Sequence, residues 1–248
     1  MTVRLVRLLL ILTMPLVLTS CLFTPGKFTS TLSINADRSF AFTFVGEIYG
    51  TDLEKMGEAF KRMAPTTSKS AGPSGTTSDR ADTMDKAMPD EGQTAGVRQA
   101  KTDAKNQQIA ETLSKEAGYR KVAYLGDGRF MVDYAIRGTL DHDFVYPFNL
   151  DAEAIFPFIA LELRIGGTVR VKAPAFAKSD DKNPMASMGD AAAGKLDGVF
   201  TLDTDAEIVS QNNEDGVKIV GGRKTIVWHA TPLTKDAPTA VLRFAGGK

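Results

Sequence analysis

The sequence predicts an α+β fold: an antiparallel, β-rich domain of open-barrel or sandwich-like form, with one short helix and one long helix from an insertion. Three observations predict it. Apolar and polar residues alternate in short runs along most of the chain, and clusters of Gly, Asn and Asp separate these runs. Most of the 14 Phe residues lie in the alternating runs. One long polar stretch interrupts the alternation, which indicates an insertion into the β-rich domain.

The first alternating run predicts a β-hairpin over residues 27–48. One face of its first strand is formed by Phe28, Ser30, Leu32 and Ile34. Residues 35–38 supply turn chemistry, because Asn and Asp side chains bond their own backbone. The returning strand places on one face Phe40, Phe42 and Phe44. These rings could form a ligand-binding stripe, but we favour a core face.

Two helices are predicted on either side of a polar segment. A capping box at Thr51–Glu54 precedes apolar residues at helical spacing, which predicts a short helix over 52–64 that packs on the sheet or lies on a membrane. Residues 65–96 contain no Val, Ile, Leu or aromatic residue, so we expect a disordered insert. Residues 97–117 are rich in Ala, Lys, Gln and Glu and end before Gly118, which predicts the long helix.

The remaining alternating runs predict the other strands. They cover residues 122–124, 130–136, 140–148, 161–165, 168–173, 196–203, 206–211, 224–230 and 239–244. Residues 149–160 predict a loop or one helical turn. Residues 174–194 are rich in Ala, Gly, Met and Ser and predict a mobile loop.

The N-terminus carries a targeting signal. Arg4 and Arg7 precede an apolar run over residues 8–18, too short for a membrane span of ~20 residues. An ordinary signal peptide or a single membrane anchor would also fit this run. However, Leu18-Thr19-Ser20-Cys21 resembles a bacterial lipobox, and Cys21 is the only cysteine. We therefore predict a cleaved signal peptide over 1–20, lipid attached to Cys21, a tether over 21–26 and one domain over 27–248.

Composition and motifs give little support to catalysis. Without residues 1–20 the chain has 28 basic and 30 acidic residues, so no nucleic-acid partner is expected. Asp141-His142-Asp143 could bind a metal, but in a strand His142 would point away from both carboxylates. No Gly-x-Ser-x-Gly or phosphate-loop motif is present. We expect no catalytic residues, no metal and no cofactor.

The C-terminal strands carry a family resemblance. The run from Lys195-Leu196-Asp197-Gly198 through Ala206-Glu207-Ile208-Val209 to Thr225-Ile226-Val227-Trp228 resembles the LppM-type domain of bacterial envelope lipoproteins. The hairpin with its turn at Asn35-Ala36-Asp37 fits the same pattern, and the resemblance breaks at 65–117. The whole chain is similar to lipoproteins of Gram-negative bacteria. This resemblance implies a compact α+β domain on a membrane anchor, envelope-lipid binding in some relatives and no enzymatic residues.

The expected function follows from the anchor and the resemblance. Leu22, directly after Cys21, resembles the residue found in lipoproteins sorted to the outer membrane, which implies a domain facing the periplasm. We expect a non-enzymatic envelope lipoprotein, held on the membrane through Cys21, that binds a lipid or another apolar envelope ligand. The alternative is an assembly protein that contacts another envelope protein through residues 65–117.

Overall fold

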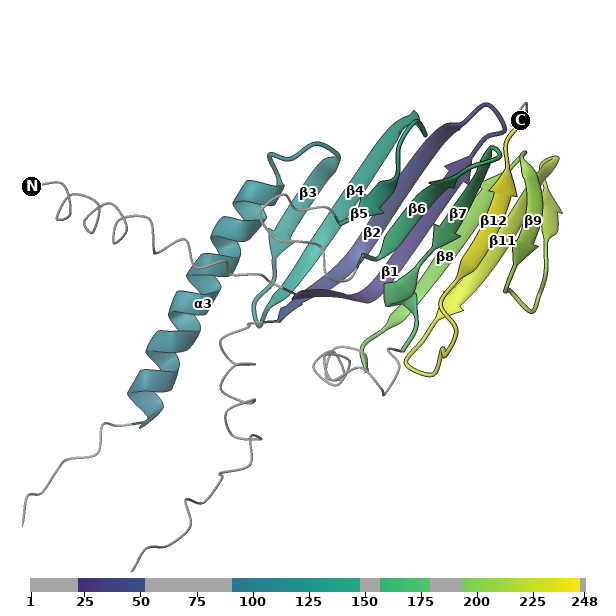
Figure 1. Cartoon of the computed structure of the whole chain (residues 1–248). Helices are drawn as coiled ribbons and strands as arrows, with labels where there is room; N and C mark the ends of the chain where they lie inside the picture. Colours follow the sequence, from purple (N-terminus) through teal and green to yellow (C-terminus); the bar gives the residue numbers. More distant parts are fainter. Residues whose placement is uncertain (1–21, 52–90, 148–156, 179–193, 246–248) are drawn as a thin grey trace, which may run out of the picture.

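In the computed structural model, residues 22–51, 91–147, 157–178 and 194–245 are described, and they form two β-sheets with one α-helix (Figure 1). The larger sheet has the spatial order β10 (Lys218–Val220), β11 (Arg223–Ala230), β8 (Asp197–Thr204), β1 (Leu22–Ile34), β2 (Ser39–Thr51), β4 (Arg129–Thr139) and β3 (Tyr119–Tyr124). The smaller sheet has the order β5 (Phe144–Tyr146), β6 (Ile159–Arg164), β7 (Thr168–Lys172), β12 (Thr239–Arg243) and β9 (Glu207–Gln211).

The two sheets lie face to face and stay open, so the expected α+β fold is confirmed in its sandwich-like form (Figure 1). Alternate residues of the strands bury their side chains between the sheets, as Phe130, Val132 and Tyr134 do on β4. This alternation follows from the pleat, because successive side chains of a strand point to opposite faces. The Phe residues predicted to form a core face, Phe40, Phe42 and Phe44, are all buried.

The first hairpin is longer than predicted, and this corrects the expected tether at 21–26. Strand β1 begins at Leu22, which pairs with Thr51, so the hairpin spans 22–51 instead of 27–48. The ladder continues past Pro25 through a bulge, in which Gly26 and Lys27 together oppose Glu47. A bulge accommodates the missing N–H of proline, which is why Pro25–Gly26 does not end the strand.

One pairing was not predicted: the sheet is not purely antiparallel. Strand β1 pairs in parallel with β8, from Lys27 opposite Asp197 to Ile34 opposite Thr204. The alternation of each strand is the same for either direction of pairing, so the sequence pattern contains no information on it. As a result, β1 lies at the centre of the larger sheet.

Two other predictions are corrected within the smaller sheet. The strand predicted over 140–148 contracts to β5. Leu140 N still continues the β2–β4 pairing by donating to Arg38 O (2.8 Å), and the chain then bends at Asp141 and His142 before it enters the smaller sheet. The mobile loop predicted over 174–194 begins with a short 3₁₀ helix, Pro174–Phe176. Its Phe176 side chain is buried against Phe28, at 4.2 Å between ring centroids, which orders this segment.

Helix α3 (Glu91–Leu113) lies beside β3 at one edge of the larger sheet (Figure 1). It begins before the predicted residue 97, so residues 91–96 are helical and not part of a disordered insert. It ends before 117, because 3₁₀-type bonds such as Lys115 N to Thr112 O (3.0 Å) close its last turn. The predicted helix at 52–64, Cys21, the signal peptide, and residues 65–90, 149–156 and 179–193 lie outside the described residues.

Candidate functional site

The predicted attachment point, Cys21, immediately precedes the larger sheet. Leu22 is the first residue of β1 and pairs with Thr51 at the end of β2. Gly50 N donates to Gly128 O (2.7 Å), so the β3–β4 turn at Leu125–Gly128 lies at the same end of the sheet. We call this the Cys21 end of the sandwich; the β1–β2 turn at residues 35–38 marks the far end (Figure 1).

Aromatic rings surround Tyr146 between the two sheets. Rings from the larger sheet approach it closely, with centroid distances of 4.4 Å to Tyr134, 5.1 Å to Phe42 and 5.6 Å to Phe44. Phe158, the residue before β6 of the smaller sheet, lies at 5.8 Å, edge to face. These contacts join the two sheets through stacking and edge-to-face packing, which stabilise aromatic pairs beyond their buried area.

The Tyr146 hydroxyl is the unusual polar group of this interior. Its side chain is 1% exposed, and among the described residues the hydroxyl oxygen has no hydrogen-bond partner. Burial raises the pKa of Tyr146 well above its ordinary value, and the neighbouring Tyr119 and Tyr134 raise it further. The group is therefore a neutral hydroxyl that can donate one hydrogen bond inside an apolar layer.

Most buried hydroxyls find partners, because an unpaired one keeps a desolvation cost of about 1–3 kcal/mol. Among the described residues one other buried side-chain atom lacks a partner, Asn213 Oδ1, but the amide nitrogen of that residue donates to Val227 O at 2.8 Å. The Tyr146 side chain has only its hydroxyl, so it has no second polar atom that could make such a hydrogen bond. A ligand that accepts a hydrogen bond would satisfy it.

The Asp141-His142-Asp143 motif lies in the bend before β5, not in a strand. His142 Nδ1 contacts Asp141 Oδ1, and both side chains are largely exposed. Asp143 Oδ1 instead accepts from Leu163 N (2.8 Å), which fastens the bend to β6. In the described part of the chain, no group of three or more His, Cys, Asp or Glu side chains is placed to hold a metal ion.

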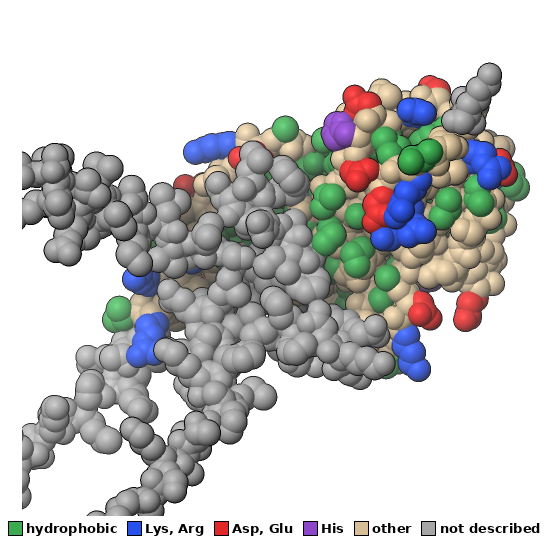
Figure 2. Space-filling model, in the orientation of Figure 1, with side chains coloured by type: hydrophobic (Ala, Val, Ile, Leu, Met, Phe, Trp, Pro, Cys, Tyr) green, Lys and Arg blue, Asp and Glu red, His purple; other side chains and the backbone are tan. Residues whose placement is uncertain are grey.

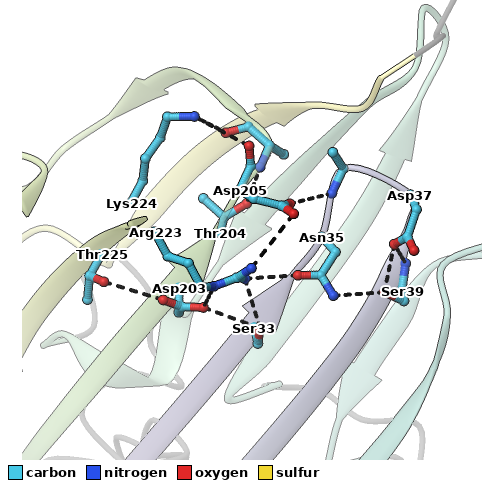
Figure 3. Close-up of polar contacts among 12 residues, drawn as sticks. Ser33, Asn35, Asp37, Ser39, Asp203, Thr204, Asp205, Arg223, Lys224 and Thr225 are labelled. Atoms are coloured by element: carbon cyan, nitrogen blue, oxygen red, sulfur yellow. Dashed lines mark hydrogen bonds and ion pairs between the residues drawn. The ribbon is translucent and has the colours of Figure 1, made fainter. Parts of the chain in front are cut away.

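A polar network that the sequence did not reveal lies at the far end (Figure 3). The guanidinium of Arg223 donates to Asp203 through Nε, and through Nη2 to Asn35 Oδ1 (2.9 Å) and Ser33 Oγ (3.3 Å). Its Nη1 pairs with Asp205 Oδ2 at 3.7 Å. Because most of its donors are engaged by the protein, Arg223 joins β1, β8 and β11 and has little capacity left for an anionic ligand.

On the face seen in Figure 2, the described surface has no large patch of one charge sign. Lys, Arg, Asp and Glu side chains lie interspersed among hydrophobic ones. Within the described ranges, no helix has the length and apolar character needed to cross a membrane.

Comparison with known proteins gives only weak likeness, and only in structure. No family model and no curated protein matches the chain. The structure of the folded domain of LppM from Mycobacterium tuberculosis, determined by NMR, aligns with 90% of this chain and 91% of its own length. The sequence identity is 15% and the TM-score is 0.31. At that score the similarity supports no statement about function.

Proposed function

We propose that this protein is a non-enzymatic lipoprotein of the bacterial envelope, anchored through Cys21, that binds a lipid or another apolar ligand between its two sheets. The outer membrane, with the domain facing the periplasm, is the proposed location. The lipobox-like motif at residues 18–21 and the apolar run before it support the anchor. Two or more acyl chains give stable attachment, whereas a single chain binds only marginally.

The observation that carries ligand binding is the unpaired Tyr146 hydroxyl. Binding sites for small apolar molecules are lined by hydrophobic and aromatic side chains, with a few polar groups that fix orientation. The interior around Tyr146 has this composition, with Phe42 and Phe44 from β2 and Phe158 from the segment before β6. A lipid ester carbonyl or a headgroup oxygen would accept the hydrogen bond that Tyr146 can donate.

Native mass spectrometry tests this proposal on protein extracted from its own membrane. We expect the protein to retain a lipid in addition to the acyl chains on Cys21, and we expect Tyr146→Phe to reduce the retained fraction. Removing an unpaired hydroxyl should also raise the free energy of unfolding of ligand-free protein, by about 1–3 kcal/mol.

Tyr124→Phe provides the matched control. The Tyr124 hydroxyl contacts Asp103 and accepts from Asn106 Nδ2 (3.3 Å) and Gly128 N (3.1 Å), so its loss should lower stability by about 1–3 kcal/mol and leave lipid retention unchanged. Protein without any retained lipid would refute ligand binding. Equal lipid retention by Tyr146→Phe and the parent would refute the role of this hydroxyl.

A further inference from the structure

Helix α3 extends past the sandwich at the Cys21 end. It runs antiparallel to β3: Asp103 and Asn106 contact the hydroxyl of Tyr124, the last residue of that strand. Residues 91–102 therefore continue beyond the sheet for roughly 18 Å, at 1.5 Å per residue. Figure 1 shows this part of the helix clear of both sheets.

The projecting part of α3 carries two basic residues, Arg98 and Lys101, and one acidic residue, Glu91, at the start of the helix. The next acidic residue along the helix, Asp103, is engaged by Tyr124. Arg98 and Lys101 are exposed, and Val97 beside them is 71% exposed. The apolar surface needed to insert into hydrocarbon is missing, so this face suits a charged surface at the membrane boundary and not the acyl region.

The position of Cys21 determines what lies next to this helix. Because β1 begins at Leu22, no linker separates the proposed lipid anchor from the sheet. Strand β1 has 13 residues and reaches roughly 40 Å at ~3.3 Å per residue. The lipid on Cys21 therefore holds the Cys21 end at the bilayer, and not the far end. The projecting half of α3 and the β3–β4 turn, with Leu125 at 44% exposed, share the end that the lipid brings to the membrane.

We propose that the N-terminal half of α3 reaches the membrane surface, with Arg98 and Lys101 against anionic lipid headgroups and Val97 and Leu125 at the boundary. Each Lys or Arg near an anionic bilayer adds to attraction that is screened within a Debye length. This inference rests on the proposed anchor at Cys21. The expectation that residues 65–117 contact an envelope protein assigns the same helix to a different partner, and that expectation stays a prediction.

Site-specific fluorescence in vesicles tests the proposal. A lipidated Cys21 is a thioether, so the parent should not react with a thiol dye, whereas one introduced cysteine should. Val97→Cys and Leu125→Cys report on the proposed surface; Ile165→Cys and Ile219→Cys, both exposed, report on the far end. The full lipidated proteins carry an environment-sensitive dye and are placed in phosphatidylethanolamine–phosphatidylglycerol vesicles that contain a lipid-borne quencher.

We expect blue-shifted, strongly quenched emission at positions 97 and 125 and unchanged emission at 165 and 219. Adding Arg98→Glu and Lys101→Glu, or omitting phosphatidylglycerol, should remove most of the quenching at 97; the control Lys218→Glu on β10 should not. Labelling of the parent would refute the anchor itself, before any vesicle is added. If Cys21 is blocked, three results would each overturn the headgroup contact. They are no quenching at 97, quenching at 165 or 219, and quenching at 97 that does not change with the two charge reversals or with the removal of phosphatidylglycerol.

Discussion

Phe28 lies between glycines of the two neighbouring strands. It pairs with Gly46 on β2 and with Gly198 on β8, and its ring stacks on Phe44 and Phe176. A Cβ added to Gly46 would meet Lys27 O at 2.4 Å and the Phe28 Cβ at 2.5 Å. A Cβ on Gly198 would meet the Phe28 ring at 2.2 Å. The aromatic packing of the core therefore depends on two positions without side chains.

Gly46→Ala should lower the free energy of unfolding by about 1–3 kcal/mol, because the backbone of β1 must shift to admit the methyl group. Chemical denaturation of the purified protein measures the change. Gly96→Ala is the control: this exposed helical position has nothing within 4 Å of an added Cβ, and alanine there should stabilise by about 0.5–1 kcal/mol. Equal effects of the two substitutions would contradict this account of Phe28 packing.

Glu162 links two strands of the smaller sheet. Its carboxylate accepts from Lys172 Nζ (2.6 Å) and Arg164 Nη2 (2.5 Å). The hydrogen bond from Lys172, followed by that from Arg164, lowers the pKa of Glu162 from its ordinary value of 4.5. A lowered folded-state pKa means that the stabilisation is fully present above pH 4.5 and is lost as the pH falls through the folded value.

Glu162→Gln should therefore destabilise at pH 7 and lose this effect in acid. The side chain is partly exposed, so we expect about 0.2–1 kcal/mol at pH 7. Urea unfolding at pH 7 and at about pH 3 gives the comparison with the parent. Glu214→Gln, in the exposed turn after β9, serves as the control for loss of charge alone. A Glu162→Gln deficit that persists unchanged in acid would exclude the ion pairs as its cause.

At the scale of elements, the central strand β1 is held in register by side chains as well as by its ladder. Arg223 on β11 reaches across β8 to Ser33 and Asn35 at the end of β1 (Figure 3). Asn35 Nδ2 continues the network to Ser39 Oγ (2.8 Å), at the start of β2. The network thus spans four neighbouring strands at the point where β1 turns.

Arg223→Ala should destabilise by about 1–3 kcal/mol, because it removes the cation that pairs with Asp203 and the donor to Asn35 Oδ1. Arg243→Ala removes an exposed pair with Glu207 (3.0 Å) and should cost about 0.2–1 kcal/mol. Thermal or urea unfolding of both variants makes the comparison. If Arg223→Ala costs no more than Arg243→Ala, the network does not stabilise the β1–β8–β11 pairing.

Elements were predictable where one face of a strand is buried. The alternation in 28–34, 130–136 and 224–230 locates β1, β4 and β11, because burial of one face imposes a period of two. The pattern failed where a contact elsewhere determines the conformation. Asp143 accepts from Leu163 N, and Phe176 stacks on Phe28, so the start of a predicted strand is a bend and the start of a predicted loop enters the core.

At the scale of the whole molecule, Cys21 adjoins the sheet, whereas the sequence predicted an intervening tether. Cys21→Ala should abolish labelling by radioactive fatty acid and leave the precursor with its signal peptide. The measurement is metabolic labelling with gel mobility of the mature and precursor forms. Loss of labelling with normal protein levels would separate the loss of acylation from a loss of folding. Continued labelling of Cys21→Ala would refute the anchor.

One part of the candidate site could be recognised from the sequence, and another part could not. The lipobox-like motif is local in sequence, since its residues are consecutive, and it was recognisable without a structure. Tyr146 was predictable only as one member of an alternating face. Its unpaired hydroxyl arises from the meeting of β2, β4 and β5, whose residues are separated in the chain. The Arg223 network had no sequence signal, because its residues come from four strands that are separated in the chain.

The sequence by itself determined the anchor motif, the β-rich class and most strands, because these depend on consecutive residues and on a period set by the pleat. Only the tertiary structure decided that β1 pairs in parallel with β8, that β1 begins at Leu22 and that α3 extends past the sheet beside it. The physical reason is that these features depend on which surfaces meet, and contacts between distant residues are not encoded in the period of any single strand.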